Sequence, residues 1–223
     1  GKERQTEIRE FDSIEATKVA VSNAKLYVDR EEGFFGIGKS MKDAEYVCDC
    51  SDIDDVIVIL RDGRYVITKV AEKKFVDKNI YYIGVFKRND ERTIYNLLYR
   101  DGKGGAIMMK RCAIKGITRD KEYDLTKGTP KSDILYLSVN PNGEAEVLKV
   151  YFKARPRLKR LIVELDFADL AIKGRQSQGN LFSRYSISKI VLKEHGTSTL
   201  SAQNIWWDED IRRLNSDGRG RLL

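Results

Sequence analysis

The stretch GFFGIGKS, residues 33–40, matches the pattern G-x-x-x-x-G-K-[ST] of a phosphate-binding P-loop. In a P-loop, backbone N–H groups of an open glycine turn surround the phosphates and the lysine reaches the outer ones. This chemistry needs a buried strand before the loop and a helix after it. Here Phe34 and Phe35 occupy variable positions, and no helical pattern follows Ser40. We therefore interpret the match as chance: Gly33 is a turn residue, and the residues after it form the returning strand of a hairpin.

Other catalytic or metal-binding sets are equally weak. The single histidine, His195, would have to serve any Ser-His-Asp arrangement, and the three cysteines, Cys48, Cys50 and Cys112, lack the paired spacing of a zinc site. A sparse, odd number of cysteines is typical of a reducing compartment. Residues 43–55 hold six acidic side chains and no basic one, without the spacing of a calcium loop. We expect no catalytic residue and no metal site, and a solvated acidic loop at 43–55.

The positive charge of the chain is clustered. The net charge is +7, with an isoelectric point of about 9.2. Residues 152–193 contain ten basic and three acidic side chains, and residues 100–121 contain seven basic and two acidic ones. Such clusters are typical of a protein that binds a polyanion. No apolar run reaches the roughly 18–20 residues needed to span a bilayer, so we expect no membrane partner.

Repeated hairpin signals indicate the elements that would position this charge. Apolar, β-rich runs surround D-G or N-G pairs at 56–70, 93–111 and 134–150, and weaker copies occur at 24–38, 161–174 and 204–214. Several runs are continuously apolar, as expected of strands covered on both faces. The pattern predicts an all-β protein built from about six hairpin-based units, closed like a propeller, although the G-H…W-D signature of WD40 blades is absent.

Long collinear motifs carry a resemblance to a known family. They are TEIREFDSIEATKVAVSNAKLYVDREEGFFGIG, CDCSDIDDVIVILRDGRYVITKV, IYNLLYRDGKGGAIMMKR, TRDKEYDLTKGTP, NPNGEAEV, DFADLAIKGRQSQGNLFSRYSISKI and IWWDEDIRRLNSDGRG. Together they resemble the C-terminal domain of the A subunit of bacterial type IIA DNA topoisomerases, that is, DNA gyrase and topoisomerase IV. They look most like the Bacteroidetes-type branch of topoisomerase IV. The resemblance covers nearly the whole chain.

The resemblance implies a fold and a function. The fold is a β-pinwheel, a propeller-like ring of five to six four-stranded blades that exchange strands with their neighbours. We expect an N-terminal arm at 1–18 and the pinwheel at 19–223, with a last blade that can be incomplete. The basic rim of the family binds and bends duplex DNA with little sequence preference and presents it as the transported segment. The catalytic tyrosine lies outside such a domain, so this chain alone is expected to be no enzyme.

Further expectations concern cofactors, partners and location. The parent enzyme would use ATP and Mg²⁺ through other domains, so none is expected here. Its partners would be double-stranded DNA, the A-subunit core of a homodimer and the B subunit, in the cytoplasm at the nucleoid, with the isolated domain monomeric. The gyrase box Q-R-R-G-G-K-G is absent, and 102–105 and 174–180 are the nearest stretches. This absence favours topoisomerase IV over gyrase.

The predicted DNA contacts are basic or amide side chains of the two basic stretches, plus one lysine of the first hairpin. They are Lys173, Arg175, Gln178, Lys103, Lys110, Arg111, Arg119, Lys121, Arg157, Lys159, Arg160, Arg184 and Lys39. Arginine can donate two hydrogen bonds to one phosphate, whereas lysine acts as a flexible point charge. The tyrosines lie within strand-like runs instead of alternating with basic residues, which argues against single-stranded RNA. An alternative is a propeller-like interaction module whose basic face binds an acidic protein.

Overall fold

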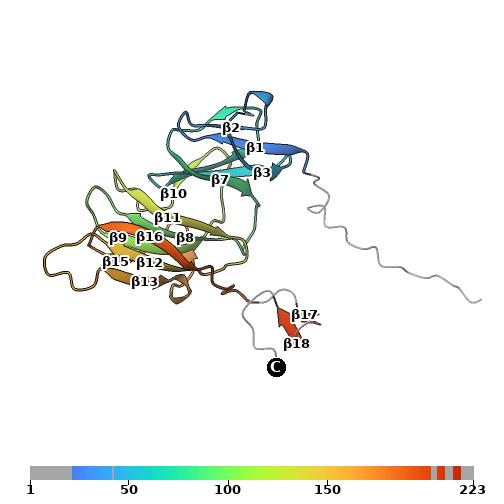
Figure 1. Ribbon diagram of the computed structural model, residues 1–223. Helices are drawn as coiled ribbons and strands as arrows, with labels where there is room; N and C mark the ends of the chain where they lie inside the picture. Colours follow the sequence, from blue (N-terminus) through green and yellow to red (C-terminus); the bar gives the residue numbers. More distant parts are fainter. Residues whose placement is uncertain (1–21, 42, 202–204, 209–212, 217–223) are drawn as a thin grey trace, which may run out of the picture.

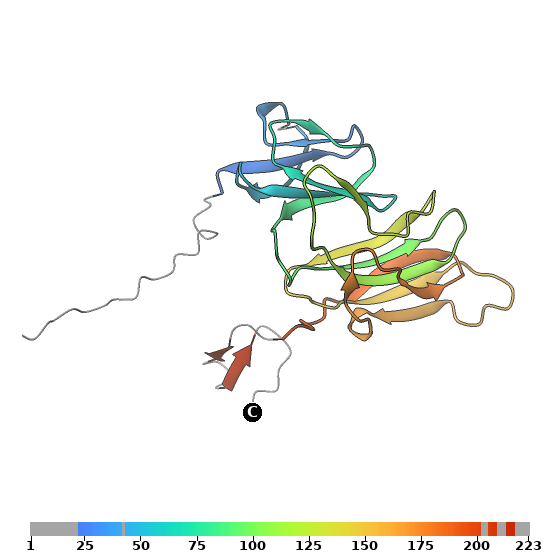
Figure 2. The same ribbon diagram turned by 180° about the vertical axis from the view of Figure 1, so that it is seen from behind.

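The computed structural model describes residues 22–41, 43–201, 205–208 and 213–216, so the predicted arm at 1–18 lies outside the described residues. These residues form strands in a stack of sheets (Figures 1 and 2). The described helical elements are two short 3-10 turns, η2 (Lys39–Met41) and η3 (Phe167–Asp169). No helix of the described part is long and apolar enough to cross a lipid bilayer. The all-β prediction is confirmed.

Four sheets and one hairpin account for the described strands. The first sheet contains β1 (Ala24–Asp29), β2 (Phe34–Gly36), β3 (Glu45–Cys50) and β6 (Lys74–Phe75). The second contains β4 (Asp55–Leu60), β5 (Arg64–Lys69), β7 (Ile80–Phe86) and β10 (Glu122–Asp124). The third contains β8 (Ile94–Arg100), β9 (Ile107–Ala113), β11 (Asp133–Asn140), β14 (Lys173–Gly174) and β15 (Asn180–Ser183). The fourth contains β12 (Val147–Phe152), β13 (Ile162–Asp166) and β16 (Ile187–Glu194), and β17 (Ile205–Asp208) pairs with β18 (Arg213–Ser216).

Neighbouring sheets exchange strands by one rule. The chain makes a hairpin in one sheet and then contributes its next strand to the sheet before it. After the β4–β5 hairpin, β6 pairs with β2 of the first sheet; after β8–β9, β10 pairs with β5 of the second. After β12–β13, both β14 and β15 pair with β9 of the third sheet. This exchange is the feature that the pinwheel resemblance implies, whereas a ring of five to six blades stays a prediction.

The hydrophobic core lies between successive sheets, and β4 shows why the sequence folds this way. All six residues of DVIVIL are buried. Val56, Val58 and Leu60 pack towards the first sheet. Ile57 and Ile59, on the opposite face, pack towards the third. Successive side chains of a strand point to opposite faces, so a continuously apolar strand needs cover on both sides. The prediction of doubly covered strands is confirmed.

The turn signals predicted some connections and misplaced others. Hairpins β1–β2, β4–β5 and β8–β9 form within the predicted stretches 24–38, 56–70 and 93–111, and Gly33 and Gly63 have φ of +79° and +97°. The N-G turn at 142–143 is real, but it connects two sheets, because β11 pairs with β8 whereas β12 pairs with β13 and β16. The hairpin predicted at 161–174 is wrong, since β14 pairs with β9 instead of β13. The expected turn near Glu209 lies outside the described residues, between strands that do pair.

The interpretation of GFFGIGKS as a turn followed by a strand is confirmed. Gly33 closes the β1–β2 turn, and Phe34 and Phe35 are paired residues of β2. The residues that follow form the single 3-10 turn η2, not an α-helix.

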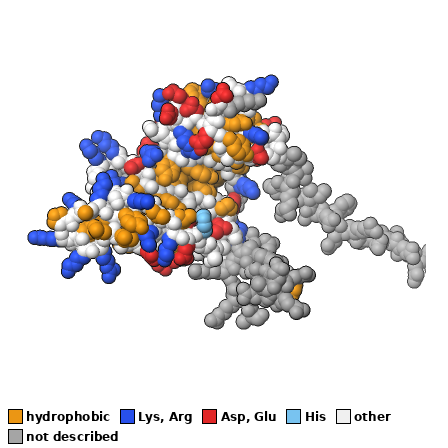
Figure 3. All heavy atoms as spheres, in the orientation of Figure 1, with side chains coloured by type: hydrophobic (Ala, Val, Ile, Leu, Met, Phe, Trp, Pro, Cys, Tyr) orange, Lys and Arg blue, Asp and Glu red, His pale blue; other side chains and the backbone are white. Residues whose placement is uncertain are grey.

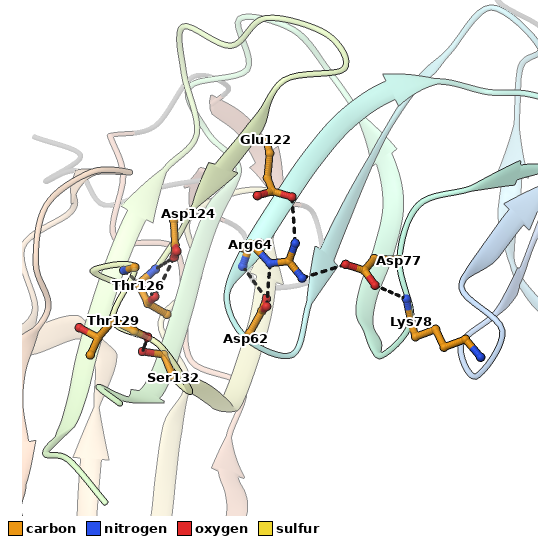
Figure 4. A network of polar contacts seen from close by, with 10 residues as sticks. Asp62, Arg64, Asp77, Lys78, Glu122, Asp124, Thr126, Thr129 and Ser132 are labelled. Atoms are coloured by element: carbon orange, nitrogen blue, oxygen red, sulfur yellow. Dashed lines mark hydrogen bonds and ion pairs between the residues drawn. The ribbon is translucent and has the colours of Figure 1, made fainter. Parts of the chain in front are cut away.

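A network of carboxylates around Arg64 fastens β10 to the second sheet (Figure 4). The guanidinium binds Asp62 at 2.7 Å, Asp77 at 2.8 Å and Glu122 of β10 at 3.1 Å. The hydrogen bond to Asp62 is the largest of the effects that raise the pKa of Arg64 above its usual value. With three carboxylates around one cation, this part of the surface has no excess positive charge.

Candidate nucleic-acid interface

Charge is divided unevenly between the two halves of the stack. Residues 22–86, which form most of the first two sheets, carry 10 Lys and Arg against 12 Asp and Glu. Residues 87–200, which form most of the third and fourth, carry 23 against 13, a net charge of +10. Figure 3 shows Lys and Arg side chains gathered at the end where Figure 1 places β13 and β15. The candidate interface therefore lies on the third and fourth sheets.

Two predicted contacts are wrong, because their side chains are buried. Lys110 and Arg111 of β9 are 1% and 2% exposed. The ammonium of Lys110 donates to the carbonyl oxygens of Leu125 and Arg175. The guanidinium of Arg111 donates to Asn96 Oδ1 at 2.9 Å and to the carbonyl of Gly143 at 2.7 Å. Neither cation is placed to contact a phosphate outside the protein. A strand in the middle of a stack buries its charged residues with its apolar ones, which composition alone does not reveal.

The segment 173–183 is laid along β9 by strand exchange. Lys173 and Gly174 pair in parallel with Cys112 and Ala113, and Asn180 pairs in antiparallel register with Met109. The chain turns back in between, where the Ser177 amide donates to the Gly174 carbonyl. This arrangement brings Lys173, Arg175 and Gln178 to one edge of the third sheet. Gln178 is exposed and the two cations are half-buried.

Arg175 links this segment to the loop after β9. Its Nε donates to the Lys115 carbonyl and one of its Nη atoms to the Gly116 carbonyl, each at 3.1 Å. The guanidinium also lies 4.2 Å from the ring centroid of Tyr123, which stacks on Tyr65. These bonds use two of the five guanidinium N–H donors. These contacts fix the position of the Arg175 guanidinium before any ligand arrives.

Three cations line a shallow hollow at this edge. Its lining includes Lys115, Lys173 and Arg175 together with Gln176 and Ser177. Lys115 forms an ion pair of 2.7 Å with Glu91, and Lys173 donates to Asn180 Oδ1 at 2.7 Å. Exposed pairs of this kind contribute about 0–1 kcal/mol, so a polyanion can displace them. Lys115 was not among the predicted contacts, although the count of basic residues at 100–121 already included it.

Arg119 has a largely structural role. Its Nε binds Oδ1 of Asp55 at 2.7 Å, while Arg88 binds Oδ2 at 2.8 Å. Burial alone raises the pKa of this carboxyl, but the two arginine hydrogen bonds outweigh burial and hold the pKa of Asp55 below its usual value. The predicted DNA contact at Arg119 would compete with this internal pair.

The remaining predicted contacts are exposed but not all together. The connection between β12 and β13, residues 153–161, projects from the end of the molecule (Figures 1 and 2) and carries Arg157, Lys159 and Arg160. Further exposed cations are Lys103, Lys121 and Arg184. Lys153, Arg155 and Lys189 are also exposed and were not predicted. Lys39 lies in η2, which follows β2 of the first sheet, and so stands apart from the third and fourth sheets.

The described residues offer no metal site. No group of three or more His, Cys, Asp or Glu side chains in this part of the chain could hold a metal ion. All three cysteines are free thiols, and Cys50 and Cys112 are buried. Burial raises the pKa of each of these two thiols to about 11.

The fold and the surface together define a class: an all-β module of successive sheets that exchange strands and whose cations gather on two adjacent sheets. Comparison with known proteins gives the family. Residues 25–195 match the model of the topoisomerase C-terminal domain of Bacteroidota, and the chain belongs to this family. It is also 25% identical, over 192 residues, to the A subunit of DNA topoisomerase 4 from Borreliella burgdorferi. That match covers 86% of this chain but 28% of the relative's length.

Proposed function

We propose that this domain binds and bends duplex DNA, without catalysis of its own, and presents it as the transported segment to the cleavage core of a type II DNA topoisomerase. The net charge of +10 on residues 87–200, most of whose lysines and arginines are exposed, carries the proposal. B-DNA gains counterion entropy when lysine and arginine neutralise its phosphates. Membership of a topoisomerase C-terminal family supplies the context in which that DNA is used.

The proposed contact mode is phosphate recognition without base reading. The exposed cations lie on strand edges and connections, and the described residues contain no α-helix that could enter a major groove. Phosphate contacts position a protein but carry no direct sequence information. The domain should therefore hold duplexes of different sequence with similar affinity. This property suits an enzyme that passes any chromosomal segment through another.

We propose topoisomerase IV as the parent enzyme, because the gyrase box is absent and the Borreliella burgdorferi relative carries that name. The parent enzyme would use ATP and Mg²⁺ through domains outside this chain. Its A-subunit core and B subunit would be the protein partners, and the bacterial nucleoid would be the place of action.

Fluorescence anisotropy with a 30-base-pair duplex at several salt concentrations tests the proposal. The affinity should fall steeply between about 50 and 200 mM salt and should not change with the duplex sequence. An affinity that is flat across this range would contradict phosphate binding and favour a protein partner. A duplex with dyes at both ends should show closer ends when the domain binds. Ligation of relaxed circles should give a weak topoisomer shift, whereas a strong shift of one sign would indicate gyrase.

A further inference from the structure

Lys110 is a buried cation without a carboxylate partner among the described residues. Its side chain is 1% exposed, and burial lowers its pKa below the usual lysine value. The ammonium donates to two backbone carbonyls, that of Leu125 at 2.8 Å and that of Arg175. Burying an ammonium costs far more than burying an apolar side chain of similar length. An apolar side chain would fill the same space at lower cost, so we look for a further role of the ammonium in its hydrogen bonds.

The two carbonyls belong to the two exchanged segments that flank β9. Leu125 follows β10, which pairs with the second sheet. Arg175 lies between β14 and β15, both of which pair with β9 itself. One ammonium thus joins its own strand to residues 15 and 65 positions further along the chain. Neither segment follows β9 in a tight hairpin that would fix its path locally.

The Arg175 carbonyl accepts a hydrogen bond from Lys110, and the Arg175 side chain donates to the Lys115 and Gly116 carbonyls. Arg175 itself lies inside the turn that the Ser177 amide closes by donating to the Gly174 carbonyl. The backbone and the side chain of Arg175 are therefore both held in place in the free protein. Fixing a binding segment in advance lowers the entropic cost of binding.

We propose that Lys110 is a positioning residue for the phosphate-binding edge at 173–178: it fixes the Arg175 backbone and never touches DNA itself. This inference rests on the proposed function. Ordering one long side chain during binding costs about three- to tenfold in affinity. By fixing the segment in advance, the Lys110 ammonium removes this cost from the binding step.

Three variants of the 223-residue chain test the role by duplex anisotropy across a salt series. Lys110→Met should weaken binding about three- to tenfold at every salt concentration, with an unchanged salt slope. Lys110→Arg keeps the donors and should bind more tightly than Lys110→Met. Lys173→Met removes a surface cation and should reduce the slope by about 0.9. A packing role predicts the opposite order, with Met harmless and Arg disruptive.

Hydrogen exchange provides a readout that does not depend on DNA. The Ser177 and Gly179 amides, which are hydrogen-bonded to the Gly174 carbonyl and to Tyr99 Oη, should be protected in the wild-type chain. In Lys110→Met they should exchange faster, while the β4–β5 amides stay protected. If Lys110→Met does not fold, Lys110→Leu, which also lacks a donor, replaces it; if neither folds, unprotected Ser177 and Gly179 amides in the wild-type chain would still overturn the inference.

Several results would overturn the inference. They are wild-type affinity in a folded Lys110→Met, a slope reduced by about 0.9 in that variant, and unprotected Ser177 and Gly179 amides in the free wild-type chain. If the wild-type chain binds no duplex, the proposed function fails, while hydrogen exchange still reports whether Lys110 fixes the segment.

Discussion

The connection between β12 and β13 offers a sharp test of the proposed DNA contact. It projects from the stack and carries exposed Arg157 and Lys159. The double variant Arg157→Gln/Lys159→Gln removes two positive charges from this connection. The matched control, Lys69→Gln/Lys78→Gln, removes two exposed lysines at the second sheet.

The expected size follows from counterion release. Each lost phosphate contact lowers the salt slope of log K by about 0.9, so two lost contacts lower it by about 1.8. Between 50 and 200 mM salt, the wild-type chain should lose about 12-fold more affinity than the double variant loses. The control should keep the wild-type slope, because its lysines lie in the acidic half of the stack.

Anisotropy titrations at four salt concentrations measure both slopes, and thermal unfolding checks that each variant is folded. Equal slopes for the double variant and its control would show that the connection makes no phosphate contact. If both variants lost the same part of the slope, total charge and not the third and fourth sheets would determine binding.

Three further predictions concern stability and reactivity. Asp55→Asn should lower the free energy of unfolding by about 2 kcal/mol at pH 7 in urea titrations, since it weakens two charged hydrogen bonds. Because the folded-state pKa of Asp55 is lowered, this difference should be present above the unfolded value near 3.9 and disappear as pH falls through the folded value. Cys112 should resist a thiol reagent at pH 8 in the folded chain, because burial raises its pKa to about 11, and should react on unfolding. Gly33→Ala should destabilise more than Gly116→Ala by thermal unfolding, since both have positive φ but a Cβ only at Gly33 would meet backbone, at 2.4 Å.

Local signals in the sequence predicted the local part of the fold. Apolar, β-rich runs around D-G pairs located the β4–β5 and β8–β9 hairpins, and the apolar run DVIVIL predicted a strand covered on both faces. The β12–β13 hairpin was missed, because its strands are separated by nine residues of basic connection without a tight-turn pair. The N-G pair at 142–143 correctly predicted a turn, but a turn signal does not determine which sheet the next strand joins.

The candidate site was predictable as a composition but not as a set of side chains. The basic stretches at 100–121 and 152–193 do lie on the third and fourth sheets. Within the first stretch, however, the basic residues of β9 differ in exposure from the basic residue of the loop after it. Lys110 and Arg111 are buried by neighbouring sheets, whereas Lys115 is exposed. The partners of these two cations lie 15 to 65 residues away in the sequence, and no local pattern encodes that.

Strand exchange also explains why the two basic stretches act as one surface. Without it, the loop after β9 would carry Lys115 alone, and the cations near 173–175 would belong to a different sheet. The parallel pairing of β14 with β9 places Lys173 opposite Cys112, so Arg175 reaches the Lys115 carbonyl. The third sheet thus receives Lys173 and Arg175 from the segment that follows β13 of the fourth sheet. Charge from residues about 60 positions apart is thereby brought to a single edge of the third sheet, where a polyanion would meet Lys115, Lys173 and Arg175 together.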